Sequence, residues 1–280
     1  MRTWIITGAS RGLGRAFAEV ALEHGDRVAA TVRSRDTASE LADRFGDRVM
    51  VLELDVTDRP AVLAAAEEVA ARWGRIDVLV NNAGYGLAGA VEEVTEELVR
   101  DQLEVNVLGA LWCTQAVLPS MRRERAGHIF QISSVGGVTS QPNTGIYCAS
   151  KWALEGMSES LAMEVQSFGI HVTIVEPGPF RTDWNGDSMQ RAPFLAAYDE
   201  VLAGRREVLS GAHARTQPGD PRRAGEALLA LLDADEPPLR LLLGSFAADH
   251  APEVARARLE EWEAWDSLAR GADFPAPPAT

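Results

Sequence analysis

The sequence is poor in cysteine, in positive charge and in long apolar runs, and each scarcity limits what the protein can be. Only two cysteines, Cys113 and Cys148, occur in 280 residues, and their positions suggest neither a disulfide framework nor a zinc site. A reducing cytoplasm therefore fits this chain. Acidic residues outnumber basic ones by 41 to 27, and the net charge of −14 disfavours nucleic acids and anionic membranes as partners.

Long apolar segments are the third scarcity. The apolar run at the N-terminus meets Gly8 too early to form the hydrophobic part of a signal peptide, and no continuous apolar run approaches about 18 residues. We therefore expect a soluble protein that is not exported. A chain of 280 residues with 46% hydrophobic composition can bury a substantial core, and no linker divides it, so a single domain spanning 1–280 is predicted.

The stretch of the chain that carries most chemistry runs from Ser134 to Lys151. Tyr147 follows Ser134 by thirteen residues, and Lys151 follows Tyr147 by four. If Tyr147 opens a helix, as the apolar pattern after it predicts, positions 147 and 151 share one face. An ammonium group beside a phenol favours the phenolate, so Tyr147 is a candidate acid/base, and Ser134 would hold the oxygen that exchanges the proton. A tyrosine and a lysine on a helix surface would give the same pattern, so the rest of the chain must decide.

A glycine-rich turn follows the first predicted strand, at 4–7. Gly8, Gly12 and Gly14 lead into a helix predicted to run to about Glu23. Backbone N–H groups and the positive end of a helix dipole suit a pyrophosphate, and glycines let the backbone approach it closely. The same glycines could serve only as a turn, but their place directly after the first strand favours a dinucleotide site.

Further motifs follow in order: Asn81-Asn82-Ala83-Gly84, then Asn106, Ser134, Tyr147 and Lys151. Together with the glycine turn, this series resembles the short-chain dehydrogenase/reductase family over residues 3 to about 183. The resemblance implies a nicotinamide cofactor and a catalytic set of Asn106, Ser134, Tyr147 and Lys151. In that family the lysine also holds the nicotinamide ribose, and the asparagine bends its helix and holds a water that connects the lysine to bulk solvent.

The end of the second predicted strand, 27–32, bears on which nicotinamide cofactor is bound. An NAD-binding site places an acidic residue here for the adenosine ribose, whereas this chain has Val32 and Arg33. Arg33 can pair with a 2′-phosphate, and Arg11 in the glycine turn could approach the same phosphate from the other side. We therefore predict NADP(H), with two solvated surface arginines as the alternative.

The resemblance also implies the remaining contacts with the cofactor. An aspartate at the position of Asp55 approaches the adenine amino group, although Asp55 could also cap the next turn, and a threonine at the position of Thr182 bonds the nicotinamide carboxamide. No metal is needed, because the Ser/Tyr pair supplies the polarisation. The residues predicted to bind the cofactor are Gly8, Ser10, Arg11, Gly12, Leu13, Gly14, Arg33, Asp55, Val56, Asn82, Ala83, Gly84, Tyr147, Lys151, Pro177, Gly178, Phe180 and Thr182.

Predicted strands and helices alternate along the chain at the interval of a doubly wound parallel sheet. The fold class is therefore α/β, a single Rossmann-type doubly wound parallel sheet with a C-terminal helical extension at about 249–280. The extension could cover a sheet edge that other family members use for tetramer packing, or it could cap the pocket. Beyond the first two, strands are expected at 49–54, 77–80, 128–132, 172–175 and 239–244, and helices at 36–45, 61–73, 96–123, 147–167 and 223–232.

Residues 184 to about 222 correspond to the variable substrate lid of the family. Its larger apolar residues would close a mostly apolar pocket or pack the lid against the core. We predict an enzyme that transfers hydride between NADP(H) and a carbonyl or secondary alcohol of a fairly bulky apolar substrate, as in the branches that resemble hydroxysteroid dehydrogenases or ketoreductases. An epimerase or dehydratase with a retained nucleotide, or a non-catalytic NADP(H) sensor, stays open, and the sequence names neither substrate, stereochemistry nor direction. The apolar lid residues are Met189, Phe194, Leu195 and Tyr198.

A homo-oligomer is expected as well, because the family often associates through the long helices that contain Asn106 and Tyr147. Leu111, Trp112 and Leu161 are the candidates for an apolar contact on their outer faces. The C-terminal helix favours a dimer over a tetramer.

Overall fold

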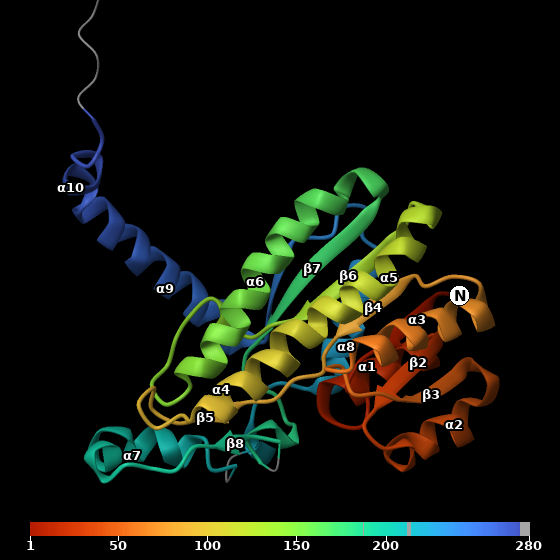
Figure 1. Cartoon of the computed structure of the whole chain (residues 1–280), viewed down its shortest axis with the longest axis horizontal. Coiled ribbons are helices and arrows are strands. Elements are labelled where there is room, and N and C mark those ends of the chain that lie inside the picture. The colour runs from red at the N-terminus through yellow and green to blue at the C-terminus, as the bar shows by residue number, and fades with distance from the viewer. Residues whose placement is uncertain (187, 212–213, 275–280) are drawn as a thin grey trace, which may run out of the picture.

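A seven-stranded parallel sheet with helices on both faces organises the chain, as a computed structural model shows (Figure 1). The structure describes residues 1–186, 188–211 and 214–274, so the last six residues of the predicted extension lie outside it. The strand order is β3-β2-β1-β4-β6-β7-β9, and every neighbouring pair is parallel. The predicted α/β fold with a doubly wound parallel sheet is confirmed.

The central strands are apolar on both faces, because helices cover both sides of the sheet. All residues of β1 and β4 are buried. A separate two-stranded sheet pairs β5 (Leu87–Ala88) with β8 (Gln190–Arg191). It connects the segment that follows β4 to the lid. The main sheet consists of β1 (Thr3–Ile6), β2 (Arg27–Val32), β3 (Val49–Glu53), β4 (Val78–Asn81), β6 (Gly127–Ile132), β7 (Ile170–Pro177) and β9 (Arg240–Leu243).

Two apolar cores lie on the two faces of the sheet. One is formed with α1 and α8, and the other with α3, α5 and α6. None of the described helices is long and apolar enough to cross a bilayer. The helices are α1 (Gly12–Glu23), α2 (Ser39–Phe45), α3 (Arg59–Trp73), α4 (Glu96–Leu103), α5 (Ala110–Glu124), α6 (Gly145–Val165), α7 (Asp199–Val208), α8 (Pro221–Leu232), α9 (Ser245–Ala264) and α10 (Asp266–Arg270).

Helix ends follow the local sequence signals. The Asp58 carboxylate accepts a hydrogen bond from Ala61 N at 3.0 Å and so caps α3, which begins with a proline in its first turn. Gly169, with φ of 69°, stops the chain after α6, and a side chain there would meet the Arg125 carbonyl.

The helix predicted over 96–123 is continuous but not uniform. Between α4 and α5 the segment Glu104–Gly109 is π-helical, and it contains Asn106. Gly109 ends this segment, where a Cβ would lie 2.6 Å from a methyl group of Val56. The wider turn brings Asn106 into the interior, and π-turns are common at functional sites.

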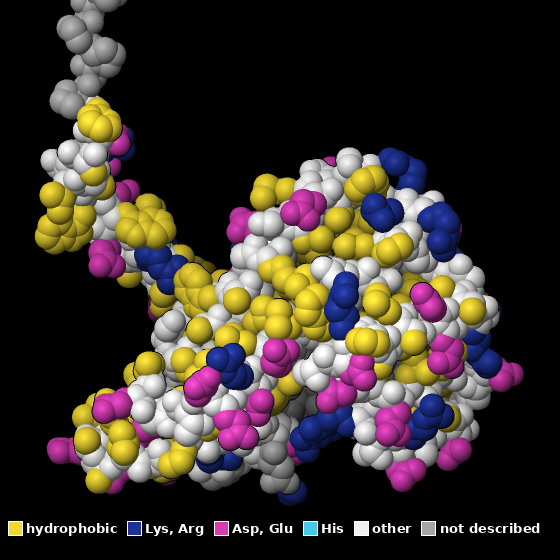
Figure 2. Space-filling model, viewed as in Figure 1, with side chains coloured by type: hydrophobic (Ala, Val, Ile, Leu, Met, Phe, Trp, Pro, Cys, Tyr) yellow, Lys and Arg dark blue, Asp and Glu magenta, His cyan; other side chains and the backbone are white. Residues whose placement is uncertain are grey.

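The C-terminal extension divides into two parts. From its start to Arg258, α9 lies along the loop between Ser134 and Tyr147, and Arg258 donates to the Val138 carbonyl at 3.3 Å. The rest of α9 and α10 project away from the body (Figure 1). Apolar side chains stay exposed along it (Figure 2), with Leu259, Trp262, Trp265 and Leu268 between 52% and 71% accessible.

One expectation about the helix surfaces is wrong. Leu161, predicted on an outer face, is only 7% exposed because it packs into the core beneath α6. Trp112 is partly buried, and the Arg59 guanidinium lies over its ring at 5.0 Å. Only Leu111 and the covered Trp112 remain at the surface that the sequence suggested for association.

Candidate active site

The candidate site lies at the carboxyl edge of the sheet, as open parallel sheets require. Gly8 follows β1, Asn82 follows β4, Ser134 follows β6, and Pro177 ends β7. Because neighbouring strands are parallel, these four chain segments meet at one edge. The sequence motifs are therefore brought together by the topology of the sheet.

Ser134 and Tyr147 lie on two sides of Gly136. The Ser134 hydroxyl accepts a hydrogen bond from Gly136 N at 3.0 Å, which fixes the turn after β6. A Cβ on Gly136 would lie 3.5 Å from Ser134 Oγ and 3.4 Å from a ring carbon of Tyr147, so both side chains approach this one glycine. The Ser134 hydroxyl is near enough to the phenol to act to lower the pKa of Tyr147.

Tyr147 is buried in the first turn of α6. Its ring meets the Trp184 ring edge-on, with centroids 5.2 Å apart and planes at 61°. Burial raises the pKa of Tyr147 above its ordinary value, and this effect exceeds the opposing one of Ser134. The phenol is therefore protonated at neutral pH.

Lys151 lies one helical turn further along the same face, as predicted, and is also buried. Its ammonium donates to the Ile132 carbonyl at 2.8 Å and lies 5.9 Å from the centroid of the Tyr147 ring. Burial lowers the pKa of Lys151 to about 8, and the nearby Glu155 carboxyl opposes that change. The net shift of the Tyr147 pKa is upward rather than downward as the sequence suggested, because desolvation outweighs the effects of neighbouring groups.

Asn106 connects the π-helical turn to the catalytic helix. Its amide nitrogen donates to the Tyr85 carbonyl and to Ser150 Oγ, both at 3.1 Å, and its oxygen accepts from Tyr85 N at 3.1 Å. A Cβ on Gly84 would lie 3.0 Å from Asn106 Oδ1 and 3.7 Å from the ammonium of Lys151. The asparagine and the lysine therefore approach the same point.

Ser150 is a site residue that the sequence did not single out. Its hydroxyl donates to the Tyr147 carbonyl at 2.7 Å while it accepts from Asn106, so it links the π-helical turn to the first turn of α6. The available signal was weak, because a serine directly before Lys151 is ordinary in a helix. Its complete burial becomes apparent only in the fold.

The glycine turn fits a dinucleotide. Gly8 and Gly12 have φ of 67° and 59°, which disfavour other residues, and a Cβ on Gly14 would clash with Asn82 and with the Gly8 carbonyl. No side chain caps the N-terminus of α1, so its first N–H groups are available to a pyrophosphate. Thr182 lies opposite, with its Cβ 3.5 Å from the position of a Cβ on Gly12. Ser10 and Leu13 belong to this same turn and helix start.

Hydrogen bonds hold the turn against the end of β4. The Asn82 side chain donates to the Thr7 and Gly8 carbonyls at 2.8 and 3.1 Å. The Thr7 hydroxyl accepts from the backbone nitrogens of Asn82 and Ala83, both at 2.9 Å. The edge of the predicted nucleotide site is therefore rigidly connected.

The two arginines predicted to read the cofactor are exposed. Neither Arg11 nor Arg33 forms an ion pair or a side-chain hydrogen bond with any described residue. Ala9 N donates to the Thr31 carbonyl at 3.0 Å, which places the glycine turn beside the end of β2 and hence near Arg33. Asp55 caps the next turn, because its Oδ1 accepts from Thr57 N at 2.9 Å and from the Thr57 hydroxyl at 2.8 Å.

The lid begins after Thr182 and is anchored by a residue outside it. The Glu93 side chain, which is 0% exposed, accepts from Leu195 N at 2.8 Å and from the Arg206 guanidinium at 2.6 Å. Its other oxygen accepts from Ala90 N at 2.7 Å. Burial alone would raise the pKa of Glu93, but these donors hold it below its usual range.

The apolar residues of the lid divide into two groups. Met189 is buried, and it packs with Trp184 against Gly86. A Cβ on Gly86 would lie 2.8 Å from Met189 and 2.7 Å from Trp184. Phe194 and Leu195 are 50% and 42% exposed, so they do not face the interior. Phe180 packs against Gly219 and Gly244, which joins the start of the lid to its end.

The sheet topology, the uncapped glycine turn and the buried Tyr/Lys pair define a nicotinamide-dependent oxidoreductase fold. Residues 2–192 match the family model described as short chain dehydrogenase. Oxidoreductase BOA17 of Botryotinia fuckeliana is 41% identical over 95% of this chain and 97% of its own. The 3-ketodihydrosphingosine reductase of Bacteroides thetaiotaomicron is 36% identical over 92% and 91% of the two chains, and human 17-beta-hydroxysteroid dehydrogenase type 1 is 34% identical over 92% and 80%.

Solved structures agree with these matches. A crystal structure of a short-chain dehydrogenase from Streptomyces avermitilis is 41% identical, with a TM-score of 0.92 over 98% of this chain and 100% of that one. An alcohol dehydrogenase from the archaeon Thermococcus sibiricus, complexed with 5-hydroxy-NADP, is 28% identical, with a TM-score of 0.70 over 86% and 95%. The chain belongs to the short-chain dehydrogenase/reductase family, as its motifs predicted. It is an oxidoreductase with NAD(P)(H) as its cofactor.

Proposed function

We propose that this protein is an NADP(H)-dependent enzyme that interconverts a carbonyl and a secondary alcohol on a fairly bulky apolar molecule. The observation that carries the proposal is the buried phenol of Tyr147, which lies across Gly136 from Ser134 and one helical turn from the buried ammonium of Lys151. These three groups are what proton transfer to a carbonyl oxygen requires.

When bound, the nicotinamide supplies or accepts the hydride. In the reductive direction Ser134 holds the carbonyl oxygen, and Tyr147 donates its phenolic proton to that oxygen. Because burial keeps Tyr147 protonated, the acid form is present at neutral pH. Lys151, with a pKa of about 8, is mostly charged at neutral pH and stabilises the phenolate that remains. Asn106 supports the return of a proton to this pair.

The proposed preference for NADP(H) is supported by charge at the end of β2. Arg33 is exposed, and no carboxylate among the described residues neutralises it; Arg11 extends from the neighbouring glycine turn. The related alcohol dehydrogenase with bound 5-hydroxy-NADP is consistent with this preference. Gly12, Gly14 and the start of α1 would hold the pyrophosphate, Lys151 the nicotinamide ribose, and Thr182 the carboxamide.

The proposed substrate class is supported by the walls beside Tyr147 and by the relatives. Trp184 and Met189 form an apolar surface next to the catalytic phenol and Gly86. Two relatives take their names from a 3-keto group on a long-chain base and from a hydroxysteroid, which are both bulky and largely apolar. A carbonyl on a large apolar skeleton suits this surface.

The experiment is a panel of bulky ketones and secondary alcohols, each assayed by nicotinamide absorbance with NADPH, NADH and their oxidised forms. Short aliphatic ketones serve as the matched control for size. We expect turnover of one or more bulky ketones with NADPH and little turnover of the short ones. Retention of nucleotide with conversion of an added substrate but no net change in absorbance would instead favour an epimerase or dehydratase.

We also propose that the enzyme works as a dimer in a reducing cytoplasm. The two cysteines are free and buried, which suits a reducing compartment. Hydrophobic side chains gather over α4, α5 and α6 in Figure 2, on the face that the family often uses for association. Light scattering at micromolar concentration tests this proposal, and a monomer would contradict it without affecting the catalytic assignment.

A further inference from the structure

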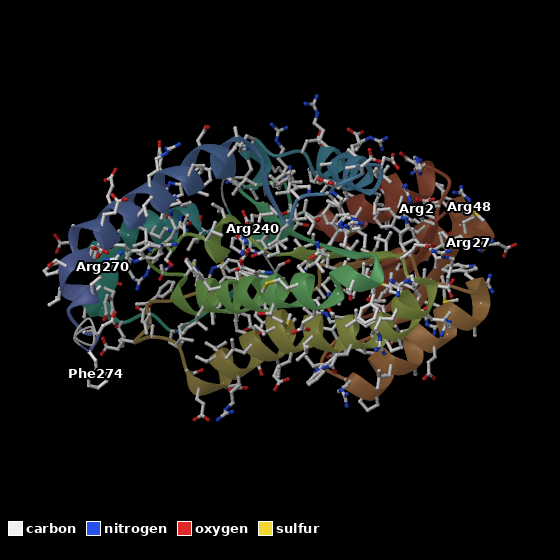
Figure 3. The ribbon with its side chains drawn as sticks, turned by 90° about the horizontal axis from the view of Figure 1, so that it is seen from above. Arg2, Arg27, Arg48, Arg240, Arg270 and Phe274 are labelled. Carbon is white, nitrogen blue, oxygen red and sulfur yellow. The ribbon has the colours of Figure 1, made fainter. Side chains whose placement is uncertain are left out.

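A buried polar cluster lies behind Lys151, one helical turn further along α6. Glu155 on α6 and Glu176 on β7 have side chains only 6% and 2% exposed. Arg240 on β9 reaches both, with Nε 3.3 Å from Glu155 Oε2 and 3.5 Å from Glu176 Oε1 (Figure 3 shows Arg240 beside α6). Two buried carboxyl groups therefore share one arginine. Burial of these groups lowers the stability of the fold, so their presence calls for a functional explanation.

Both carboxyl groups of the cluster hold a proton more tightly than an exposed glutamate does. Burial and repulsion by the neighbouring Glu155 carboxylate raise the pKa of Glu176 to about 7. Burial also raises the pKa of Glu155, but Ser133 and Arg240 act in the opposite direction. Glu176 therefore retains its proton to higher pH than an ordinary glutamate, and Glu155 is the carboxylate that favours the charged form of Lys151.

Glu155 also contacts the turn that holds the substrate oxygen. Ser133 directly precedes Ser134, and its hydroxyl and Glu155 Oε1 converge on Gly137, where a Cβ would lie 2.9 Å from that oxygen and would clash with Ser133. The hydroxyl is near enough to lower the pKa of Glu155, although neither oxygen makes a hydrogen bond of good geometry. Lys151 fixes the same strand end from the adjacent turn of α6 through the Ile132 carbonyl at 2.8 Å.

We propose that Glu155 is a positioning residue for the reaction, which supports the Ser133-Ser134 turn from behind and balances the charge of Lys151 from the next turn of α6. This inference rests on the proposed roles of Ser134 and Lys151. The charged or titratable groups facing the cluster are Lys151 and Glu159 on α6, Glu176 on β7 and Arg240 on β9. Of these, Glu155 is the carboxylate that acts on Lys151.

The sign of the effect follows from this placement. A negative charge favours the protonated ammonium, so its removal lowers the pKa of Lys151. The same removal makes the surroundings of Tyr147 more positive and lowers the pKa of its phenol. A variant that lacks the charge should therefore have its whole acid/base response displaced to lower pH.

Lys151 is the only lysine of the sequence, so the test can observe it directly. Protein labelled with ¹³C at lysine Cε gives one side-chain signal, whose shift is followed from pH 6 to 10. Glu155→Gln should lower the pKa of Lys151 by roughly 0.5 to 1 unit. Glu159→Gln is the matched control, since Glu159 also contacts Arg240, at 3.1 Å, but is 53% exposed and one turn further away; it should leave the titration unchanged.

Loss of Glu155 allows Glu176 to ionise, and the new Glu176 charge partly replaces the lost one. The double variant Glu155→Gln/Glu176→Gln should therefore lower the pKa of Lys151 by at least as much as Glu155→Gln does. With a verified substrate, kcat of Glu155→Gln should fall by roughly threefold to tenfold, and the pH profile of kcat/KM should move with the lysine titration. Ser133→Ala should lower kcat and leave the lysine titration in place, because it removes only the support of the turn. If Glu155→Gln does not fold, Glu155→Asp takes its place and should titrate within about 0.3 unit of wild type, since it keeps the charge.

A Lys151 titration in folded Glu155→Gln that coincides with wild type overturns the inference, as does a displacement equally large in Glu159→Gln. A change in melting temperature alone would assign Glu155 a purely structural role and would also overturn it. The titration needs neither substrate nor nucleotide. It therefore keeps its meaning even if the proposed substrate class fails, and a failed titration leaves that class untouched.

Discussion

The catalytic centre and the lid are held in place in different ways. Tyr147, Lys151 and Asn106 project from helices packed on the sheet, and the polar atoms of Lys151 and Asn106 are bonded to neighbours that the fold already fixes. The lid consists of short turns and α7, and a buried ion pair between Glu93 and Arg206 anchors it from outside. Damage to the centre should therefore affect chemistry without loosening the fold, whereas damage to the lid anchor should affect substrate binding.

The largest expected effect is at the catalytic phenol. Tyr147→Phe removes the exchangeable proton and keeps the ring against Trp184, so kcat should fall by at least about 10² while nucleotide affinity stays similar. The measurement is steady-state turnover with a verified substrate, beside nucleotide binding by fluorescence. Near-normal turnover would show that Tyr147 is not the acid/base.

Lys151→Met should be at least as damaging, by about 10² or more in kcat, because it removes the charge beside the phenol. It should differ from the tyrosine variant in one respect: binding of the nucleotide should also weaken, since Lys151 is proposed to hold the nicotinamide ribose. The two variants are therefore compared by calorimetric titration with the nucleotide. Equal affinities would remove the ribose contact from the proposal.

The end of β2 shares the rigidity of the centre but presents exposed charge. Arg33→Asp should weaken NADP(H) by lost attraction and added repulsion, while the new carboxylate can accept from the ribose hydroxyls of NAD(H). The ratio of catalytic efficiencies for NADPH and NADH should shift towards NADH by roughly tenfold to a hundredfold. Arg11→Ala should shift it less, in the same direction.

Wild-type preference for NADH would contradict this assignment before any variant is made. A ratio that stays fixed in Arg33→Asp would show that the arginine is an ordinary surface charge. Arg35→Asp is a suitable control, because Arg35 is an exposed arginine two residues further on. It should leave the ratio near the wild-type value.

The same contrast explains what the sequence could predict. Gly8, Gly12 and Gly14 encode a turn whose backbone angles demand glycine, and the period of α6 places Tyr147 and Lys151 on one face, so local pattern was enough. The pKa of Tyr147 could not be predicted, because its direction depends on how deeply the phenol is buried. The family resemblance supplied the roles of Asn106 and Thr182, which no spacing rule gives.

The lid resisted prediction for a different reason. Glu93 stands among several acidic residues between positions 92 and 97, and nothing local marks it as the one that becomes buried. Its partner Arg206 lies 113 positions away, in a helix without a strong apolar stripe. The prediction that Leu161 lies on an outer face was wrong for a similar reason, since its burial depends on how α6 packs on the sheet.

Breaking the lid anchor tests the contrast directly. Arg206→Met leaves the buried Glu93 carboxylate with backbone donors but without its counter-ion, which is a strongly unfavourable state for a buried group. We expect the lid to loosen, with KM for a bulky substrate raised by roughly tenfold and kcat changed less. Proteolysis within 190–215 should become faster.

Arg223→Met is the matched control, because that arginine is 84% exposed and its one ion pair with a described residue is a 4.0 Å contact with Asp220. It should leave KM and the proteolysis rate near wild type. If Arg206→Met instead lowers kcat as strongly as the catalytic variants do, the lid and the centre are not separable, and the comparison fails.

The smallest expected effect concerns stability and pH. Burial raises the pKa of Glu176 to about 7, well above the value of about 4.3 for an unfolded glutamate. The folded state therefore binds this proton more tightly, so the contribution of Glu176 to stability is fully present below about pH 4.3 and is lost as pH rises through about 7.

Glu176→Gln mimics the protonated form and should escape that loss. After allowance for screening by Arg240, its melting temperature should exceed that of wild type by about 2 to 6 °C at pH 8 and by clearly less at pH 5. Thermal unfolding of both proteins at the two pH values measures the difference, and Glu159→Gln, at an exposed carboxylate beside the same arginine, should show no such dependence. An equal difference at pH 5 and pH 8 would mean that Glu176 does not retain its proton to higher pH than an ordinary glutamate.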